Sequence, residues 1–214
     1  MSIIVFGAGQ IGIVVASILQ ESGQIVEGFV DDRSEMIGLT VFGLPVLGGR
    51  DWLISNKKSR TVCIGVGTIK ARKTVSEFLD AAEIPTVGAI HPSALISPEV
   101  EIENDVVAGA GCVFFGRVRL GRGCYIGPSV TVSHDTCVGD WCLLSVGTVV
   151  GARVDISNDV FVGTASTLME PGFGSDARLQ IGQAATIGAG ALVIRNVEPN
   201  TTVIGRPAKQ LQKV

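Results

Sequence analysis

The sequence predicts a chain of two domains, an α/β Rossmann-like half-domain over residues 1–85 followed by a left-handed parallel β-helix over residues 86–214. Three observations carry this prediction. A pattern of strand, glycine turn and helix opens the chain. A six-residue repeat of apolar side chains occupies most of the remainder. Glycine is abundant, at 28 of 214 residues, and aromatic residues are scarce, at 5%, which indicates many tight corners.

The first domain begins with an apolar strand over residues 3–6 and the turn Gly7-Ala8-Gly9-Gln10-Ile11-Gly12. A helix is expected over residues 11–21 and a second strand over residues 26–30, which ends at Asp31 and Asp32. This order places GxGxxG between a strand and a helix, the context of a nucleotide phosphate site. A strand over residues 61–66 and a helix over residues 69–82 follow. About four strands fit before Pro85, so we expect a site for one nucleotide and no second half for a dinucleotide.

The repeat places a bulky side chain at nearly every sixth position from Ile90 to Leu168. Four residues after each of these lies a small or β-branched residue, and Cys112, Cys124 and Cys142 occupy such positions. A period of six is typical of a hexapeptide β-helix, in which about 18 residues complete one triangular coil and coils stack about 4.8 Å apart. Both sets of side chains are therefore expected inside the prism.

An insertion interrupts the repeat after Leu168, because the phase resumes at Ile181, thirteen residues later. The segment from Glu170 to Arg178 is rich in Gly, Pro and Asp, and we expect it to project as a loop. Leu168 lies 36 positions beyond Val132, which is two full coils. The loop is therefore expected on the same side of the prism as the hexad that begins at Val132.

Composition excludes several function classes. The formal net charge is −3 and the basic residues form no stripe, so nucleic acid is not expected as a partner. No apolar run reaches the ~18 residues of a membrane span, and the N-terminus lacks a signal pattern, so we expect a cytoplasmic protein without membrane contact. Five cysteines without CxxC spacing suggest neither a disulfide framework nor a metal site.

His134 is the candidate for proton transfer. The sequence has two histidines, His91 and His134, too few for the three zinc ligands of a γ-type carbonic anhydrase. The repeat phase turns Val132 and Thr136 inward, so His134 is expected to point out of the prism. Imidazole titrates near neutral pH, and the adjacent Asp135 is suited to orient it as a general base. An ordinary surface His–Asp pair is the alternative.

These segments resemble the bacterial sugar acyltransferases that include the sialic-acid O-acetyltransferases and the N-acetyltransferases acting on UDP-4-amino sugars. The resemblance runs nearly end to end. It is carried by Gly7-Ala8-Gly9, Phe29-Val30-Asp31-Asp32, Ile90-His91-Pro92-Ser93-Ala94, Val132-Ser133-His134-Asp135, Val138-Gly139-Asp140 and Val203-Ile204-Gly205-Arg206-Pro207-Ala208-Lys209.

The resemblance implies a homotrimer with acetyl-CoA bound between adjacent prisms, His134 as the catalytic base and Asp135 as its partner. It also implies two groups of binding residues. A UDP-sugar would be held by Gly9, Gln10, Ile11, Asp31, Asp32 and Gly65. Acetyl-CoA would be contacted by Leu143, Thr164, Gly205, Pro207 and Lys209.

Two positions depart from the family pattern. Members often carry a second histidine nine residues after the catalytic one, where this chain has Leu143. The glycine loop of the UDP-sugar members often ends Gly-His-Gly, whereas here Ile11 stands in place of the histidine.

The expected function is therefore transfer of an acetyl group from acetyl-CoA to an amine or hydroxyl of a sugar, with a UDP-linked amino sugar favoured. Three alternatives remain open at this point. They are a sialic-acid O-acetyltransferase, an NAD-linked enzyme that uses the solenoid to oligomerise, and a non-catalytic solenoid scaffold. A Rossmann-like unit kept only for packing is a further reading of the first domain.

Overall fold

The computed structural model describes residues 2–170, 172 and 177–210. The chain divides into two compact units, Met1–Pro92 and Ser93–Val214, so the boundary lies seven residues beyond the one expected after residue 85. Most of the segment expected to project as a loop, residues 171 and 173–176, lies outside the described residues.

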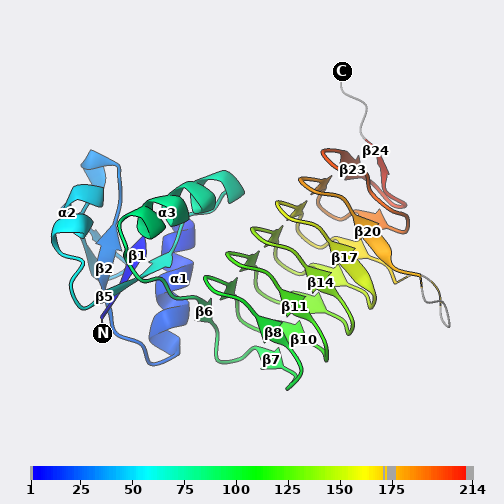
Figure 1. Cartoon of the computed structure of the whole chain (residues 1–214), viewed down its shortest axis with the longest axis horizontal. Coiled ribbons are helices and arrows are strands. Elements are labelled where there is room, and N and C mark those ends of the chain that lie inside the picture. Colours follow the sequence, from blue (N-terminus) through cyan, green and yellow to red (C-terminus); the bar gives the residue numbers. More distant parts are fainter. Residues whose placement is uncertain (1, 171, 173–176, 211–214) are drawn as a thin grey trace. The chain divides into compact units, whose positions relative to one another are not determined.

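The first unit is a twisted sheet with helices packed on it, shown in blue to cyan in Figure 1. The sheet order is β3-β4-β2-β1-β5, and its neighbouring strands are parallel except for the antiparallel pair β3 and β4. The elements in chain order are β1 (Ser2–Phe6), α1 (Gln10–Glu21), β2 (Val26–Val30), η1 (Ser34–Met36), β3 (Thr40–Val41), β4 (Leu44–Gly48), α2 (Arg50–Ser55), β5 (Arg60–Ile64), α3 (Ile69–Ala81) and β6 (Ala89–Ile90).

The carboxyl ends of the parallel strands β1, β2, β4 and β5 lie at one edge of this sheet, where the glycine turn begins α1. Tight backbone packing explains the last glycine of that turn. A Cβ atom on Gly12 would lie 1.8 Å from the carbonyl oxygen of Gly7 and 3.5 Å from that of Gly65. The turn therefore brings the start of α1 against the end of β5, and both frame the same edge.

The second unit is a left-handed parallel β-helix whose short strands stack as successive coils, in green to red in Figure 1. The partners in neighbouring strands are 18 residues apart, as in Phe114 with Val132 and Leu120 with Val138. This spacing confirms the three-hexad coil. At the insertion the separation grows to 25 residues, between Ile156 and Ile181.

Three faces make up the prism. The first face has the order β22-β19-β16-β13-β10-β7, from Leu192–Val193, Thr167–Leu168, Val149–Val150, Thr131–Val132, Val113–Phe114 and Leu95–Ile96. The second face has the order β20-β17-β14-β11-β8, from Leu179–Ile181, Val154–Ile156, Cys137–Val138, Arg119–Leu120 and Glu101–Ile102. The third face includes β24-β23-β21-β18-β15-β12-β9, from Lys209–Gln210, Thr202–Ile204, Thr186–Ile187, Phe161–Val162, Leu143–Leu144, Tyr125–Ile126 and Val107–Ala108.

The interior follows the predicted two-phase pattern. Bulky residues such as Phe114, Leu120 and Ile126 are buried. The small inward positions add a row of side-chain hydrogen bonds, because several of them donate to a carbonyl oxygen 15 residues further on. Examples are Cys112 to Gly127, Cys124 to Gly139, Thr136 to Gly151 and Cys142 to Ser157. These cysteines are free thiols that satisfy interior carbonyl groups, and Cys137 instead lies half-buried on the second face.

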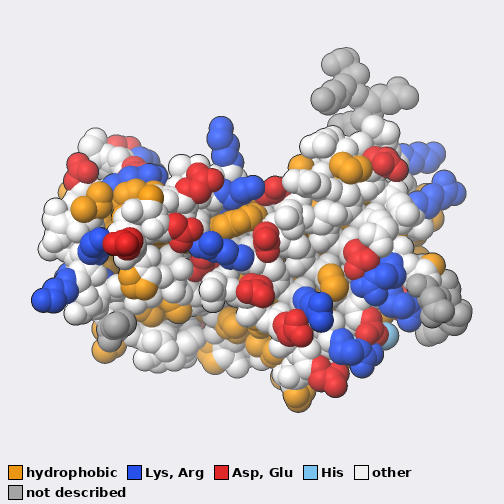
Figure 2. All heavy atoms as spheres, viewed as in Figure 1, with side chains coloured by type: hydrophobic (Ala, Val, Ile, Leu, Met, Phe, Trp, Pro, Cys, Tyr) orange, Lys and Arg blue, Asp and Glu red, His pale blue; other side chains and the backbone are white. Residues whose placement is uncertain are grey.

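The outward side chains differ between the faces. On the second face they are mostly charged or polar: Glu101, Arg119, Cys137, Asp155 and Gln180. On the first and third faces they are apolar or Thr, and Leu95, Val149 and Phe161 are exposed. Figure 2 shows acidic and basic side chains interspersed over the coils of the second unit. Two faces are thus suited to packing against protein, and one to water.

Candidate functional site

The structure places His134 and Asp135 at the corner between the first and second faces, directly after β13. The left-handed backbone of Asp135, with φ of 59°, turns the chain there. Its carboxylate Oδ2 lies 2.7 Å from Nδ1 of His134. The imidazole points out of the prism, with 47% of the side chain exposed, as the repeat phase predicts. We call these two residues the His–Asp pair.

The geometry of this pair fixes the proton on the imidazole. Arg117, at the same corner of the preceding coil, binds the carboxylate through Nε at 2.6 Å and Nη2 at 3.0 Å. Arg117, followed by His134, holds the pKa of Asp135 well below its usual range. An ionised carboxylate only accepts hydrogen bonds, so Nδ1 of His134 carries the proton and Nε2 keeps a lone pair. That lone pair is exposed and able to accept a proton.

Small residues lie at the corner above and below the imidazole. Gly116 occupies the preceding coil and the buried Ala152 the following one. The end of the insertion also reaches this corner, because Nη2 of Arg178 donates to the backbone oxygen of Asp135 at 2.8 Å. The turn that carries the His–Asp pair is therefore anchored from the coil below and from the insertion.

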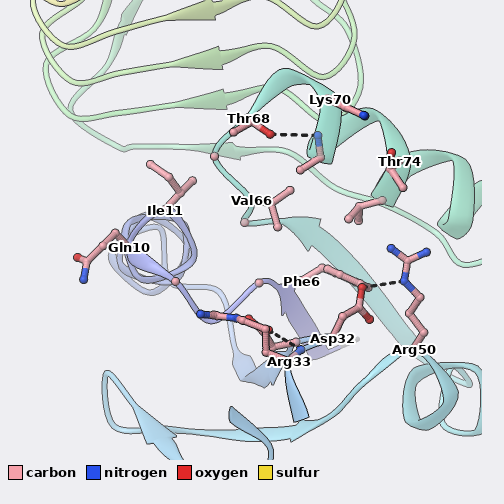
Figure 3. Close-up of a pocket in the computed structure, with 17 residues that line it drawn as sticks. Phe6, Gln10, Ile11, Asp32, Arg33, Arg50, Val66, Thr68, Lys70 and Thr74 are labelled. Atoms are coloured by element: carbon pink, nitrogen blue, oxygen red, sulfur yellow. Dashed lines mark hydrogen bonds and ion pairs between the residues drawn. The ribbon is translucent and has the colours of Figure 1, made fainter. Parts of the chain in front are cut away.

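A second candidate site is a pocket of about 580 Å³ at the edge of the sheet in the first unit (Figure 3). The turn after β1, the start of α1, the residues after β2 and the start of α3 border it. Of the expected substrate residues, the structure brings all six to this pocket: Gly9, Gln10, Ile11, Asp31, Asp32 and Gly65. Gly9 is the N-cap of α1 and has no side chain to cap the helix, so the first amide groups of α1 are suited to bind an anion.

Asp31 is buried and fully engaged by the protein. Its Oδ1 accepts from the backbone and Nε of Arg33, at 3.0 and 2.9 Å. Its Oδ2 accepts from the backbone of Ala8 and from Nη2 of Arg33, both at 2.8 Å. These bonds, led by those from the Arg33 side chain, lower the pKa of Asp31 to about 2. No lone pair remains for the ribose diol that such a carboxylate binds in dinucleotide sites.

We expect Asp31→Asn to destabilise the protein by roughly 2 kcal/mol at pH 7, because a pKa lowered from 3.8 to about 2 stabilises the ionised folded state. This stabilisation is complete above pH 4 or so and is lost as the pH falls toward 2. The difference between wild type and variant in urea unfolding should therefore narrow over that interval. The exposed Glu77→Gln is the control and should change stability by less than about 0.5 kcal/mol. A constant difference at all pH values would contradict the assignment.

The cations of the pocket were missed by the motif-based analysis. Arg33 is paired with Asp31, and Nε of Arg50 lies 2.9 Å from Oδ2 of Asp32. Arg50 also stacks over the Phe78 ring, 4.5 Å from its centroid. Lys70 lines the pocket from α3, next to the Thr68 N-cap, and Figure 3 shows it there. Among the described lining residues, Lys70 thus supplies the positive charge that balances no pocket carboxylate.

The residues expected to contact acetyl-CoA lie elsewhere on the β-helix. Leu143 is half-buried on the third face, and Thr164 is exposed at the corner between the third and first faces. Gly205 belongs to that same corner, since its oxygen accepts from Leu192 and Gly190 donates to Thr164. Pro207 follows it, and Lys209 lies on β24. Within one chain, the structure does not bring these residues to the corner of the His–Asp pair.

No helix among the described residues is long and apolar enough to cross a membrane. The same part of the chain contains no group of three His, Cys, Asp or Glu side chains arranged to hold a metal ion.

Comparison with known proteins defines the class of protein. Residues 2–79 match the PglD N-terminal domain family. Perosamine N-acetyltransferase from Caulobacter crescentus, solved with CoA and GDP-perosamine, is similar with a TM-score of 0.89 and 25% identity, over 100% of this chain and 98% of that one. The acetyltransferase domain of PglB from Neisseria gonorrhoeae, solved with acetyl coenzyme A, gives a TM-score of 0.89 and 28% identity, over 98% of each chain.

Curated proteins match the chain over a shorter range. Serine acetyltransferase from Synechococcus elongatus is 30% identical over 105 residues, 44% of this chain and 40% of that protein. The putative acetyltransferase C18B11.09c from Schizosaccharomyces pombe is 29% identical over 109 residues, 50% of this chain and 49% of that protein. The chain thus spans less than half the length of these relatives.

Fold and domain content therefore confirm the resemblance inferred from the motifs. The chain belongs to the hexapeptide-repeat acyltransferases of the sugar-modifying type, with an N-terminal unit of the PglD family.

Proposed function

We propose that the chain is an acetyl-CoA-dependent N-acetyltransferase of a nucleotide-linked amino sugar, with a UDP-sugar as substrate and His134 as general base. The observation that carries this proposal is the His–Asp pair, in which an ionised Asp135 fixes the proton on Nδ1 and leaves Nε2 of an exposed imidazole unprotonated. The similar N-acetyltransferases solved with CoA or acetyl coenzyme A favour the same chemistry.

The proposed reaction is direct transfer. The sugar amine attacks the thioester carbonyl of acetyl-CoA, and Nε2 of His134 takes the proton that the nitrogen loses as the new C–N bond forms. Collapse of the tetrahedral intermediate breaks the C–S bond, and the departing thiolate takes that proton from the imidazolium. Asp135 stabilises the imidazolium between the two steps. The net products are the N-acetylated sugar and CoA with a free thiol.

The pocket in the first unit is the proposed site for the nucleotide. The first amide groups of α1 and the Lys70 ammonium are suited to bind the diphosphate, since helix N-termini and cations both favour negative charge. The saturated carboxylate of Asp31 speaks against an NAD site. A UDP-sugar remains our preferred ligand, and a GDP-sugar is the alternative that the perosamine enzyme suggests.

We further propose a homotrimer in which acetyl-CoA binds between neighbouring prisms. Two observations support it. The first and third faces present apolar or Thr side chains outward, and the corner between them carries the expected acetyl-CoA residues Thr164 and Gly205. The His–Asp pair lies at a different corner of the same chain. A site that needs both corners is complete when a neighbouring copy supplies one of them.

Light scattering should give a mass about three times the 22.2 kDa chain mass. Phe161→Glu places a charge on the exposed part of the third face and should shift the protein toward a monomer with little activity. Arg119→Glu introduces the same side chain on the charged second face and should remain trimeric. A wild-type protein that is monomeric and fully active at micromolar concentration would refute the shared site.

The direct test of the proposed function is release of free CoA thiol from acetyl-CoA in the presence of amino sugars linked to UDP, GDP or dTDP, with unlinked amino sugars and sialic acid as comparators. We expect turnover with a UDP-amino sugar and none with its N-acetylated form. Turnover confined to sialic acid would replace the proposal with an O-acetyltransferase. No thiol release with any acceptor would refute acetyl transfer to these sugars.

A further inference from the structure

The Asp135 carboxylate is shared between two partners. Oδ2 lies 2.7 Å from Nδ1 of His134 and 3.0 Å from Nη2 of Arg117, while Oδ1 accepts from Nε of Arg117 at 2.6 Å. The guanidinium therefore binds the carboxylate in the bidentate, planar mode that arginine favours. The negative charge that would stabilise a protonated imidazole is drawn toward a permanent cation.

The backbone holds this arrangement in register. Arg117 and Asp135 are 18 residues apart and occupy the same position of consecutive coils, with φ of 60° and 59°. The amide of Asp135 donates to the oxygen of Gly116 at 3.2 Å. The oxygen of Asp135 in turn accepts from Arg178. The repeat itself thus delivers Arg117 to Asp135, and the turn cannot shift without breaking these contacts.

The other charged groups at this corner are largely paired among themselves. Nη1 of Arg117 lies 3.6 Å from Oε2 of Glu99. In the following coils Arg153 pairs with Glu170, and Arg178 with Asp155. Among the described residues of this corner, Arg117 is therefore the cation whose side chain binds the carboxylate of the His–Asp pair. These charged groups, by coil, are Glu99 and Arg117 before the pair and Arg153, Asp155, Glu170 and Arg178 after it.

We propose that Arg117 is a positioning residue that lowers the basicity of His134 by holding and partly neutralising Asp135. The proposal rests on the proposed function for its catalytic consequence, but the coupling itself is a property of the folded protein. Without Arg117, the full charge of Asp135 acts on the imidazolium, so the pKa of His134 rises. His134 is then protonated over a wider pH range and is available as a base over a narrower one.

An NMR titration tests this coupling without any substrate. The sequence has two histidines, so the imidazole signals of His134 and His91 are readily assigned, and His91, paired with Glu21 in the first unit, is an internal reference. Arg117→Met should raise the pKa of His134 by about half a unit or more, because one nearby charge is lost from an exposed site. Arg117→Lys keeps the cation and should reverse most of that shift.

Arg119→Met is the matched control. Arg119 is similarly exposed, at 67% against 63% for Arg117, and forms an equivalent ion pair with Glu101 at 2.9 Å, one strand position away from Asp135. Its removal should leave the titration of His134 unchanged. An unchanged or lowered pKa of His134 in Arg117→Met, or an equal shift in Arg119→Met, would overturn the proposal.

The pH profile of kcat/KM provides the catalytic readout. In Arg117→Met the acid limb should move upward with the pKa of His134, so activity falls about threefold below that pKa and changes little above it. A uniform loss at all pH values would show a structural role instead. The titration separates the two levels of the argument. A shifted His134 in a protein that acetylates no sugar would refute the proposed function and retain the coupling, whereas an active enzyme with an unshifted His134 would refute only the coupling.

Discussion

His134→Ala should lower kcat by about 10²–10⁴ and leave the melting temperature nearly unchanged, because a general base contributes a factor of that size. The side chain is about half exposed and points away from the interior, so its removal creates no cavity. Steady-state thiol release and thermal unfolding of the same preparation check both parts. Asp135→Asn should cost less, since it removes the charge beside the imidazole but leaves Nε2 in place.

His91→Gln is the control for this experiment. His91 pairs with Glu21 in the first unit, so the change removes the other imidazole of the chain without touching the His–Asp pair. We expect near wild-type kcat for His91→Gln. Near wild-type turnover of His134→Ala would instead show that the amine arrives deprotonated and that His134 is not the base.

Gly9→Val should abolish the stabilisation of the first unit by nucleotide while leaving the unliganded protein intact. We expect millimolar UDP or UDP-sugar to raise the melting temperature of wild type and NAD to do little. A Cβ atom on Gly9 meets nothing within 4 Å, and its φ of −90° suits valine, so the variant folds. The branched side chain nevertheless blocks close approach of a phosphate to the first amide groups of α1.

The unliganded melting temperature is the control for that variant, since an equal value shows that only binding is lost. Stabilisation of wild type by NAD but not by UDP would contradict the single-nucleotide interpretation and favour a dehydrogenase. Equal stabilisation of wild type and Gly9→Val by UDP would place the phosphates elsewhere. Stabilisation by GDP alone would transfer the proposal to a GDP-sugar.

The β-helix was predictable to the residue because its signal repeats. Each coil places bulky and small side chains at fixed offsets, so an error at one position, such as Ala108, does not disturb the phase. The first unit has one copy of each element, and its prediction was less complete. The strands β3 and β4 and the helix α2 were missed, because Thr40–Val41 and Arg50–Ser55 are short and have little periodicity.

The His–Asp pair was visible in the sequence because its members are adjacent, but their partners were not. Asp31 was expected to bind substrate, and the sequence does not reveal that Arg33, two residues on, occupies both of its oxygens. Arg117 is different. The 18-residue period places it beside Asp135, so the same repeat that predicted the fold contains this contact. The combination of Lys70 with the glycine turn required the structure, since α3 brings it there from the far side of the sheet sequence.

The insertion after Leu168 has a consequence for how this chain folds and varies. Coils normally join residues 18 positions apart, and the insertion stretches one such step to 25. By loop-closure entropy, the longer step costs only about 0.3 kcal/mol more, because the cost grows with the logarithm of length. Folding that spreads from coil to coil therefore crosses this point almost as readily as any other. Corners of the prism are accordingly places where evolution can lengthen the chain, and with it reshape the surroundings of the His–Asp pair, while the coils above and below keep their register.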